Sequence, residues 1–420
     1  MNLAIIGSGI SGLAAAWLLA RRHNVTLFEA DGRLGGHTCT VNVREGQRTL
    51  PLDIGFMVFN HHTYPNLTRL FTNLSIPTHP AEMSLSVSCR SCQLEYSGGS
   101  LRGLVAQPTN LLRLPFWHLL RGTLDFNWRA RAALHRPGGL PTGESLAALL
   151  TRWELDGEVA RHYLYPMAAA IWSTGTGPIT EFPARPILLF MANHGLLGVT
   201  THHQWYSVVG GASAYVAALA APLGARAHTG VKVHAVERRP KCVRLHFENG
   251  ESQYFDGVII ATHADQALRL LADPDRDERE LLGPWRYSSN RVMLHTDTAL
   301  LPSRRAAHAA WNVTQRTCDE PGEKVCVTYL LNRLQEVDSR QTYLVTLNPV
   351  ALPERGSIVL DTTMRHPVMT AQSLATQGDL PRLNGVKRTW FCGAYHGWGF
   401  HEDGLTSAIR VAAELGVTFP

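Results

Sequence analysis

Lysine is nearly absent from this chain. Only four of its 420 residues are lysine, at positions 232, 241, 324 and 387, so the basic side chains are almost all arginine. The formal net charge is only +5, and no stretch forms the dense basic patch by which nucleic-acid-binding domains are recognised. We therefore expect no nucleic-acid partner.

Long hydrophobic runs are also missing. No run of about 18 apolar residues appears, so the sequence predicts no membrane-spanning helix. A structured motif has begun by residue 5, which argues against an ordinary secretion signal. The seven cysteines are scattered and odd in number, which is typical of a reducing compartment. These features predict a cytoplasmic protein.

Clusters with the spacing of a metal site are not found either. Cys89 and Cys92 form a single CxxC pair between two strand-like runs, SLSVS and LEYS, and a zinc site of two pairs would need a second. A hairpin turn explains this pair. Adjacent histidines at 61–62 and 202–203 lack a third ligand at suitable spacing. The sequence therefore predicts no metal centre.

The first 29 residues contain a complete β-turn-helix-β pattern. An apolar strand at 3–6 leads through GSGISG into an alanine- and leucine-rich helix at 13–22, and a second strand at 25–28 ends in Glu29. In such a unit Gly7 permits the tight turn, Gly9 lets a pyrophosphate approach the backbone, and Gly12 allows close packing of helix on strand. The helix N-terminus then faces the phosphates, and Glu29 is placed to accept hydrogen bonds from ribose hydroxyls. This pattern predicts a dinucleotide-binding fold.

Further motifs resemble those of two-dinucleotide-fold flavoproteins. A second glycine pair follows the acid in ADGRLGGHT, and DIGF comes at 53–56. Residues 228–236 and 256–262 read as strands, and 390–393 and 403–408 as the last strand and its helix. These motifs are similar to those of the amine oxidase and phytoene desaturase superfamily. The resemblance implies an α/β fold, with a Rossmann-like FAD domain and a mixed α+β substrate domain.

The resemblance also implies which residues bind FAD. With the residues of the first turn, they are Gly7, Gly9, Ser11, Gly12, Glu29, Ala30, Arg33, Gly35, Gly36, His37, Gly55, Phe56, Val231, Gly393, Asp403, Gly404, Leu405 and Ala408. We expect this FAD to be noncovalent, because the C-terminal region lacks the cysteine used for covalent attachment and Cys392 lies inside the expected strand.

A narrower resemblance covers nearly the whole chain. DIGFMVFNHHTYPNL, YLYPMAAAIWS and FCGAYHGWGFHEDGL look like a bacterial branch of FAD-binding proteins within the amine-oxidase-like group. Members of that branch often accompany cyclopropane-fatty-acyl-phospholipid synthase-like methyltransferases, and some relatives are implicated in desaturating methyl-branched fatty acyl chains. The resemblance therefore implies a lipid substrate.

Two departures from better-known amine oxidases bear on the reaction. The stretch 287–295, where those enzymes often carry a lysine near flavin N5, offers Asn290 and Arg291, and we expect none of the four lysines to lie near it. The residue after the last-strand glycine, often an acid, is Ala394. The amine oxidase reaction is thus less favoured than dehydrogenation of a lipid.

Domain boundaries follow from where the motifs lie. We expect the FAD domain to comprise 1–75, 205–275 and 386–420, and the substrate domain to comprise 76–204 and 276–385. A total of 420 residues exceeds a single core of ordinary size, which agrees with two domains.

The glycine-rich segment GAYHGWGFHEDGL at 393–405 forms the lip of the expected flavin site. Its candidate catalytic residues are His401, His396, Tyr395 and Trp398. A histidine titrates near neutral pH and suits a general base, so His401 is the first choice and His396 the second. An aromatic cage for an amine, from Tyr395 and Trp398, is the alternative, and a noncatalytic flavoprotein partner of a lipid-modifying enzyme is the third hypothesis.

Residues 111–137 bear on a membrane partner. They carry five arginines and one aspartate, with interleaved phenylalanines and tryptophans. Such a stretch suits the face of a bilayer that holds anionic lipid. A pair of helices with inward aromatics is the other interpretation, favoured because Pro115 and Gly122 would interrupt a single long helix.

Overall fold

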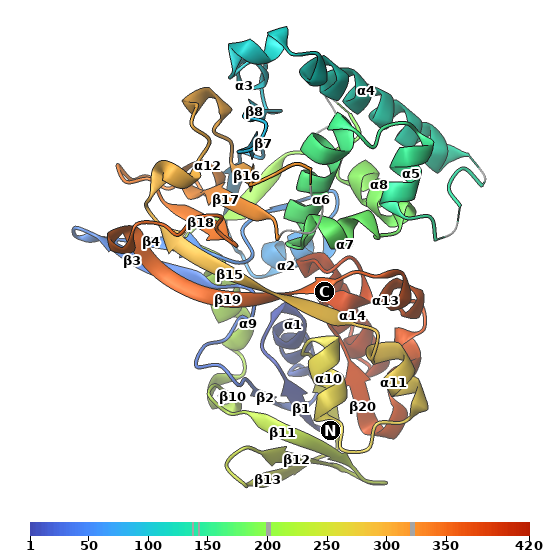
Figure 1. Cartoon of the computed structure of the whole chain (residues 1–420). Coiled ribbons are helices and arrows are strands. Elements are labelled where there is room, and N and C mark those ends of the chain that lie inside the picture. The colour runs from blue at the N-terminus through green and yellow to red at the C-terminus, as the bar shows by residue number, and fades with distance from the viewer. Residues whose placement is uncertain (137, 142, 199–202, 320–323) are drawn as a thin grey trace.

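The computed structural model describes residues 1–136, 138–141, 143–198, 203–319 and 324–420 (Figure 1). His202, one of the paired histidines, lies outside this part of the chain. The fold has helices and sheets throughout, as expected for an α/β flavoprotein. No helix of the described residues is long and apolar enough to cross a membrane.

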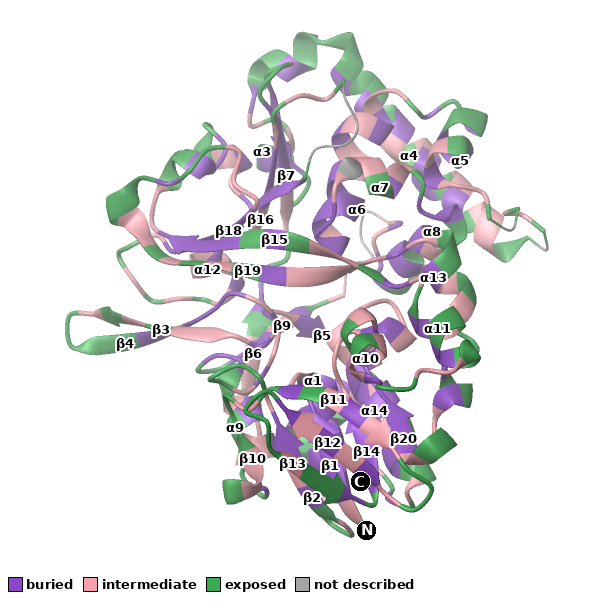
Figure 2. Ribbon diagram, turned by 60° about the horizontal axis from the view of Figure 1, so that its bottom comes forward, coloured by how far each residue is buried: buried purple, intermediate pink, exposed green. Residues whose placement is uncertain are grey.

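A parallel five-stranded sheet forms the lower part of the molecule, and Figure 2 shows its central strands as buried. Its order is β10-β2-β1-β14-β20. The strands are β1 (Asn2–Ile6), β2 (Asn24–Phe28), β10 (Ala227–His228), β14 (Gly257–Ile260) and β20 (Thr389–Phe391). Three separate stretches of sequence therefore build one sheet, while the domain boundaries themselves stay a prediction.

The helix after β1 begins earlier than the sequence indicated. Helix α1 spans Ile10–Leu19 instead of 13–22, with Gly9 as its N-cap, and nine of its ten residues are buried. Because it is apolar on all sides, it lies in the interior between the sheet and α14 (His401–Glu414) and α9 (Ser213–Ala220).

The stretch 228–236 is two strands and not one, which corrects the sequence interpretation. β10 ends at His228, and β11 (Val233–Arg238) starts a separate antiparallel sheet with β12 (Val243–Phe247) and β13 (Ser252–Phe255). Between them Gly230 has φ +69°. This left-handed conformation turns the chain out of the parallel sheet.

A seven-stranded sheet forms the second main layer, and its two long strands cross the middle of the molecule (Figure 1). Its order is β19-β15-β18-β17-β16-β7-β8. The strands are β7 (Leu85–Cys89), β8 (Leu94–Ser97), β15 (Arg286–His295), β16 (Trp311–Gln315), β17 (Cys326–Leu330), β18 (Leu344–Leu347) and β19 (Ile358–Val368). Cys89 and Cys92 lie at the β7–β8 turn, so the predicted hairpin is confirmed.

Residues 111–137 contain one long helix, which corrects the expected helix pair. Helix α4 spans Leu114–His135. Pro115 stands in its first turn, where the missing N–H costs nothing. A Cβ at Gly122 would overlap Val159, so this glycine permits close packing and does not interrupt the helix.

The remaining elements complete the two layers and their connections. The helices are α2 (Pro65–Asn73), α3 (Leu101–Leu104), α5 (Leu146–Arg152), α6 (Tyr165–Trp172), α7 (Thr176–Thr180), α8 (Ala184–Asn193), α10 (Ala264–Leu270), α11 (Arg276–Leu282), α12 (Leu331–Leu334) and α13 (Ala371–Thr376). The hairpin β3 (Thr40–Glu45) and β4 (Arg48–Asp53) extends outward, and β5 (Phe59–Asn60), β9 (Trp205–Val208) and β6 (Thr78–Ala81) form a small antiparallel sheet.

Candidate active site

The first glycine turn has the shape of a cradle for a phosphate group. Gly7 has φ +98°, and its N–H donates to Phe28 O at 2.9 Å. A Cβ at Gly12 would overlap Gly7 O, whereas a Cβ at Gly9 would meet no protein atom within 4 Å. The space beside Gly9 is therefore open on the protein side, as a closely approaching ligand requires.

Glu29 stands at the end of β2, directly beside this turn. Its carboxylate accepts hydrogen bonds from the backbone N–H of Ser8 at 2.8 Å, from the Ser8 hydroxyl at 2.5 Å and from Asp31 N at 2.9 Å. Ser8 is buried, and apart from its place between two glycines no sequence pattern indicates its role. The predicted contact of Glu29 with ribose hydroxyls stays a prediction.

The second glycine pair packs onto the first turn. Gly35 N donates to Ser8 O at 3.1 Å, and a Cβ at Gly36 would come within 3.0 Å of Gly9 Cα. Arg33 donates to the carbonyl oxygens of Gly36 at 2.8 Å and Thr38 at 3.0 Å. The guanidinium therefore holds this loop against the cradle.

Two helix N-termini converge here. Helix α14 begins at His401, two residues before the expected position, and a Cβ at Gly404 would lie 2.7 Å from Ser11 Oγ in the first turn of α1. Gly393 N donates to Ser407 Oγ at 2.9 Å, which ties β20 to α14. Unpaired N–H groups at two helix ends favour an anionic ligand between them.

The other predicted cofactor residues lie in and around this region. Phe56 N donates to His37 O at 3.0 Å, and Val231 N donates to Glu29 O at 2.9 Å. Leu405 and Ala408 are buried in α14, and a Cβ at Gly55 would overlap His37 O. Ala30 is exposed at the start of the loop after β2.

His401 is held on three sides by residues from other elements. Its Nε2 is 3.0 Å from Thr38 Oγ1 and 3.0 Å from Tyr215 OH, and these two hydroxyls also bond to each other. Its ring stacks on Phe56 at a centroid distance of 3.9 Å. Burial, aided by the neighbouring His37, lowers the pKa of His401 to about 3, so the imidazole is neutral at pH 7. The expectation that this histidine titrates near neutral pH was therefore wrong.

The other lip candidates differ in exposure. Tyr395 is only 2% exposed and packs on Trp285, and its hydroxyl has no hydrogen-bond partner in the described chain. Burial lowers the pKa of His396 to about 4, and Trp398 accepts a hydrogen bond from Trp172 Nε1 through its carbonyl at 3.3 Å. No observation tests the catalytic roles predicted for these residues.

Comparison with protein-family models identifies the family of this chain. The model of the family described as flavin containing amine oxidoreductase matches residues 10–416. The chain belongs to this family. It is thus an FAD-dependent oxidoreductase.

Three similar proteins illustrate the comparison. Protoporphyrinogen oxidase 2 (chloroplastic/mitochondrial) of Arabidopsis thaliana is 63% identical over 36 residues, which are 8% of this chain and 7% of that protein. The structure of cyclohexylamine oxidase from Brevibacterium oxydans IH-35A matches with 17% identity, TM-score 0.68 and 99% coverage of both chains. The CLA-producing fatty acid isomerase from P. acnes matches with 14% identity, TM-score 0.68 and 99% coverage of both chains.

The residues of this flavoenzyme fit FAD. The open side of Gly9 and the N-termini of α1 and α14 would hold the diphosphate, and Glu29 would meet the ribose. Cys392, next to the lip in sequence, follows directly after β20 and is fully buried, and noncovalent binding stays a prediction. When bound, FAD supplies the acceptor for two electrons and a proton.

Strand β15 corresponds to the stretch where better-known amine oxidases often carry a lysine, and here it has a buried asparagine. Asn290 is buried, and its amide donates to His366 Nδ1 at 2.9 Å, whereas Arg291 points the other way and pairs with Asp361. The expectation that no lysine is near was wrong. Lys324 Nζ donates to Ser289 O at 2.8 Å, because the fold returns a distant segment to this strand.

Sequence reasoning missed a cluster of histidines beside the cradle. The ring of His37 lies 5.6 Å from that of His263 and 5.2 Å from that of His366. Burial lowers the pKa of all three, to about 3 for His263 and His366. Their positions in the sequence are far apart, so no local pattern could have indicated the cluster.

Proposed function

We propose that this flavoenzyme dehydrogenates a hydrophobic substrate, a modified or methyl-branched fatty acyl chain, and that it belongs to the branch associated with cyclopropane-fatty-acyl-phospholipid synthase-like enzymes. The observation that carries the proposal is the aromatic wall beside the lip. It supports an apolar substrate better than a cationic one.

The wall is built from α6, α8 and the lip. The ring of Phe190 stacks on Phe400 at 5.2 Å and on His194 at 3.8 Å, and Trp172 lies 4.9 Å from Phe190. Burial lowers the pKa of His194 to about 4, so this ring adds no positive charge at neutral pH. Phe190 and Trp172 are only 4% and 5% exposed, so what favours an acyl chain is the apolar character of this region and not an open groove.

The acids of the lip are occupied by backbone groups. Glu402 accepts hydrogen bonds from Asn66 N at 3.0 Å and Leu67 N at 3.0 Å, which cap helix α2. Asp403 accepts from Phe400 N at 2.9 Å, and burial raises its pKa to about 6. Neither carboxylate is free to pair with an ammonium group, which disfavours a polyamine.

His401 is the residue best placed to take a proton. Within the described chain its Nδ1 has no hydrogen-bond partner, while Nε2 faces two hydroxyl oxygens. If Nε2 carries the hydrogen and donates it to Thr38 or Tyr215, the lone pair of Nδ1 is available for the substrate C–H proton. The hydroxyls and Phe56 then fix the ring orientation.

An amine oxidase is the second candidate. The stacked rings of His194 and Trp205, with centroids 6.0 Å apart, and of Phe400 could face a small cation, as aromatic cages do. The fold does not separate the two candidates, since a cyclohexylamine oxidase and a fatty acid isomerase match it with the same TM-score.

Anaerobic reduction of the bound flavin separates them. We expect methyl-branched or otherwise modified fatty acyl lipids to bleach the flavin absorbance, and common mono- and polyamines to have little effect. Rapid bleaching by a simple amine, with no response to any lipid, would show that the amine reading is right.

Replacement of His401 by glutamine is expected to slow this reduction by about 100-fold or more, the usual effect of losing a general base. FAD content should stay unchanged, and His61→Gln, on an exposed histidine, is the matched control. Because the pKa of His401 is about 3, the wild-type rate should not fall between pH 8 and pH 5 through protonation of this group. An unchanged rate in the His401 variant would remove it from the mechanism.

We also propose that helix α4 contacts an anionic membrane surface. Its outward face carries Leu114, Trp117, Leu124 and Trp128, which are 74%, 50%, 58% and 65% exposed, together with Arg121. Leu112, just before the helix, is 88% exposed. Large apolar groups beside arginines, at helical spacing on the outer face, fit an interface that holds acidic lipid headgroups.

Vesicle sedimentation tests this contact. Vesicles with anionic lipid should bind the protein at low salt and release much of it at high salt, because salt screens the arginine attraction. The double variant Trp117→Ser, Trp128→Ser should lose most binding, whereas Tyr254→Ser, on an exposed ring of the β12–β13 hairpin, should retain it. Equal binding by both variants, or none by the wild type, would refute the membrane contact.

A further inference from the structure

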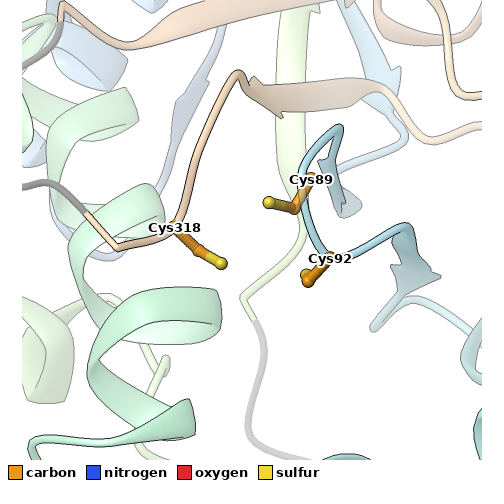
Figure 3. Close-up of side chains that lie close together, drawn as sticks. All are labelled: Cys89, Cys92 and Cys318. Carbon is orange, nitrogen blue, oxygen red and sulfur yellow. The ribbon is translucent and has the colours of Figure 1, made fainter.

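Three cysteines from two distant stretches meet at one edge of the seven-stranded sheet (Figure 3). The Sγ atoms of Cys89, Cys92 and Cys318 all lie within 4.8 Å of one another. All three are free thiols, Cys89 buried and the others half-buried. They stand on the β7–β8 side of the sheet, whereas β15 and β19, next to the flavin site, form its other side.

Strand register explains why Cys318 comes to this place. β16 runs parallel to β7 with Gln315 opposite Cys89, so the chain that leaves β16 passes the hairpin turn. Gln93 has φ +58° and closes the turn that presents Cys89 and Cys92 on the same side. The sequence shows one CxxC pair, and the sheet brings the third thiol to it from 226 residues beyond Cys92. The contact between Ser91 Oγ and Cys318 Sγ, at 3.6 Å, lies at the same place.

A histidine stands beside the thiols. His162 is 2% exposed, and its Nε2 lies 3.7 Å from Cys92 Sγ. It belongs to a π-helical turn, Ala160–Leu164, a rare widening that is frequent at functional sites. Tyr96 OH donates to His162 O at 2.8 Å and fixes this turn against the hairpin.

We propose that Cys89, Cys92, Cys318 and His162 bind one structural zinc ion. From Zn–S and Zn–N bond lengths, a tetrahedral site has S···S distances of about 3.8 Å and S···N distances of about 3.5 Å. The observed 3.7 Å between Cys92 Sγ and His162 Nε2 fits. The three Sγ atoms lie within 4.8 Å of one another, but that group does not include a nitrogen of His162, so metal binding must bring Cys89 or Cys318 closer to the imidazole as well as draw the thiols together. Four protein ligands leave no open position, which makes the site structural and not catalytic.

The surroundings suit such a centre. Three thiolates around Zn²⁺ leave one negative charge, and Arg113, which donates to Cys92 O at 3.1 Å, and Arg161 line the same cleft of about 440 Å³. Glu158 Oε2 lies 3.4 Å from His162 Nε2 and would give up this contact when the metal binds. The cleft provides an entry path for the ion.

A redox pair made of Cys89 and Cys92 is the competing interpretation. A disulfide between them would need neither the third thiol nor the imidazole, and both are present. The metal explains all four groups together.

The zinc site would connect the hairpin to the helical layer. Helix α6 begins three residues after His162, and Trp172 at its far end donates to Trp398 O in the lip. Loss of the metal should therefore lower the melting temperature and leave the phosphate cradle, and FAD, in place.

Metal analysis of the intact flavoprotein tests the proposal. We expect one zinc per chain by mass spectrometry, and a Co²⁺-loaded sample with thiolate-to-metal absorption bands. Competition with a chromogenic chelator should show that Cys318→Ser weakens zinc binding by more than about 100-fold. Loss of a residue that only hydrogen-bonds to a metal ligand weakens binding by at most about 100-fold. His162→Gln should weaken it in the same direction, with FAD content unchanged in both.

Cys242→Ser is the matched control, because this cysteine lies immediately before strand β12 and outside the cysteine cluster. If a variant fails to fold, chelator competition on the wild-type protein still gives a result. Absence of bound zinc after purification and reloading with zinc, a Cys89–Cys92 disulfide in the reduced-buffer protein, or equal zinc affinity in Cys318→Ser would each overturn the proposal.

Discussion

Replacing Gly9 with valine is expected to yield a folded protein that does not retain FAD. The backbone at Gly9 has φ −63° and ψ 179°, which any residue adopts, and its Cβ would meet no protein atom within 4 Å. The valine side chain would instead enter the space of the diphosphate. Overpacking costs about 1–3 kcal/mol or more, and lost backbone hydrogen bonds add to it, so we expect FAD affinity to fall at least about 100-fold.

A matched variant separates binding from folding. Gly12→Val puts the same side chain where a Cβ overlaps Gly7 O, so it should disrupt the β1–α1 packing and reduce soluble yield. Flavin absorbance per protein and circular dichroism measure the two effects. A yellow Gly9→Val protein with normal FAD content would show that the cradle is not at this turn.

The protein should lose stability when the pH falls from 7.5 to 5. His263, His366 and His401 have pKa values of about 3, and the pKa of His37 is also lowered, all mainly through burial. The unfolded chain binds protons at these groups below pH 6.5 and the folded chain does not, so protonation favours unfolding. His263, His366 and His401 each contribute about 1–2 kcal/mol at pH 5 after a discount for partial exposure, and His37 acts in the same direction.

Two buried acids oppose this trend and limit it. Burial raises the pKa of Asp53 and Asp403 to about 6, so the folded state binds extra protons there between about pH 4 and 6. Each recovers about 1 kcal/mol over the same range. The histidines outweigh the two acids. The three histidines with a pKa of about 3 and the two acids together give a net loss of about 1–4 kcal/mol at pH 5, and the lowered pKa values of His37, His194 and His396 act in the same direction.

Urea unfolding at pH 7.5 and pH 5 measures this loss. His366→Gln should reduce the difference between the two pH values by about 1 kcal/mol or more, while His61→Gln, on an exposed histidine, should not change it. Equal stability at both pH values in the wild type would contradict neutral buried histidines.

The flavin cofactor was predictable because the signals for it are local. Gly7, Gly9 and Gly12 act through backbone space within one turn, and Glu29 follows the next strand, so short spacing is enough to identify them. Strand and helix limits were less accurate. His401 and Glu402 were assigned to a loop, yet they form the first turn of α14, because Asp403 caps its N-terminus.

Helix α4 shows how a local rule can mislead. Pro115 and Gly122 are helix breakers in an exposed interior, but one lies in the first turn and the other packs against Val159. Only the tertiary contact decides whether a glycine interrupts a helix or permits close approach.

Local sequence patterns were enough to predict the dinucleotide fold and the flavin, since each depends on residues that are neighbours along the chain. The tertiary structure alone decided which side chains far apart in the sequence come together. It placed His37 against His263 and His366, brought Lys324 to β15, and put Cys318 beside Cys89. Strand register and packing of distant elements set these meetings, and no spacing along one chain encodes them.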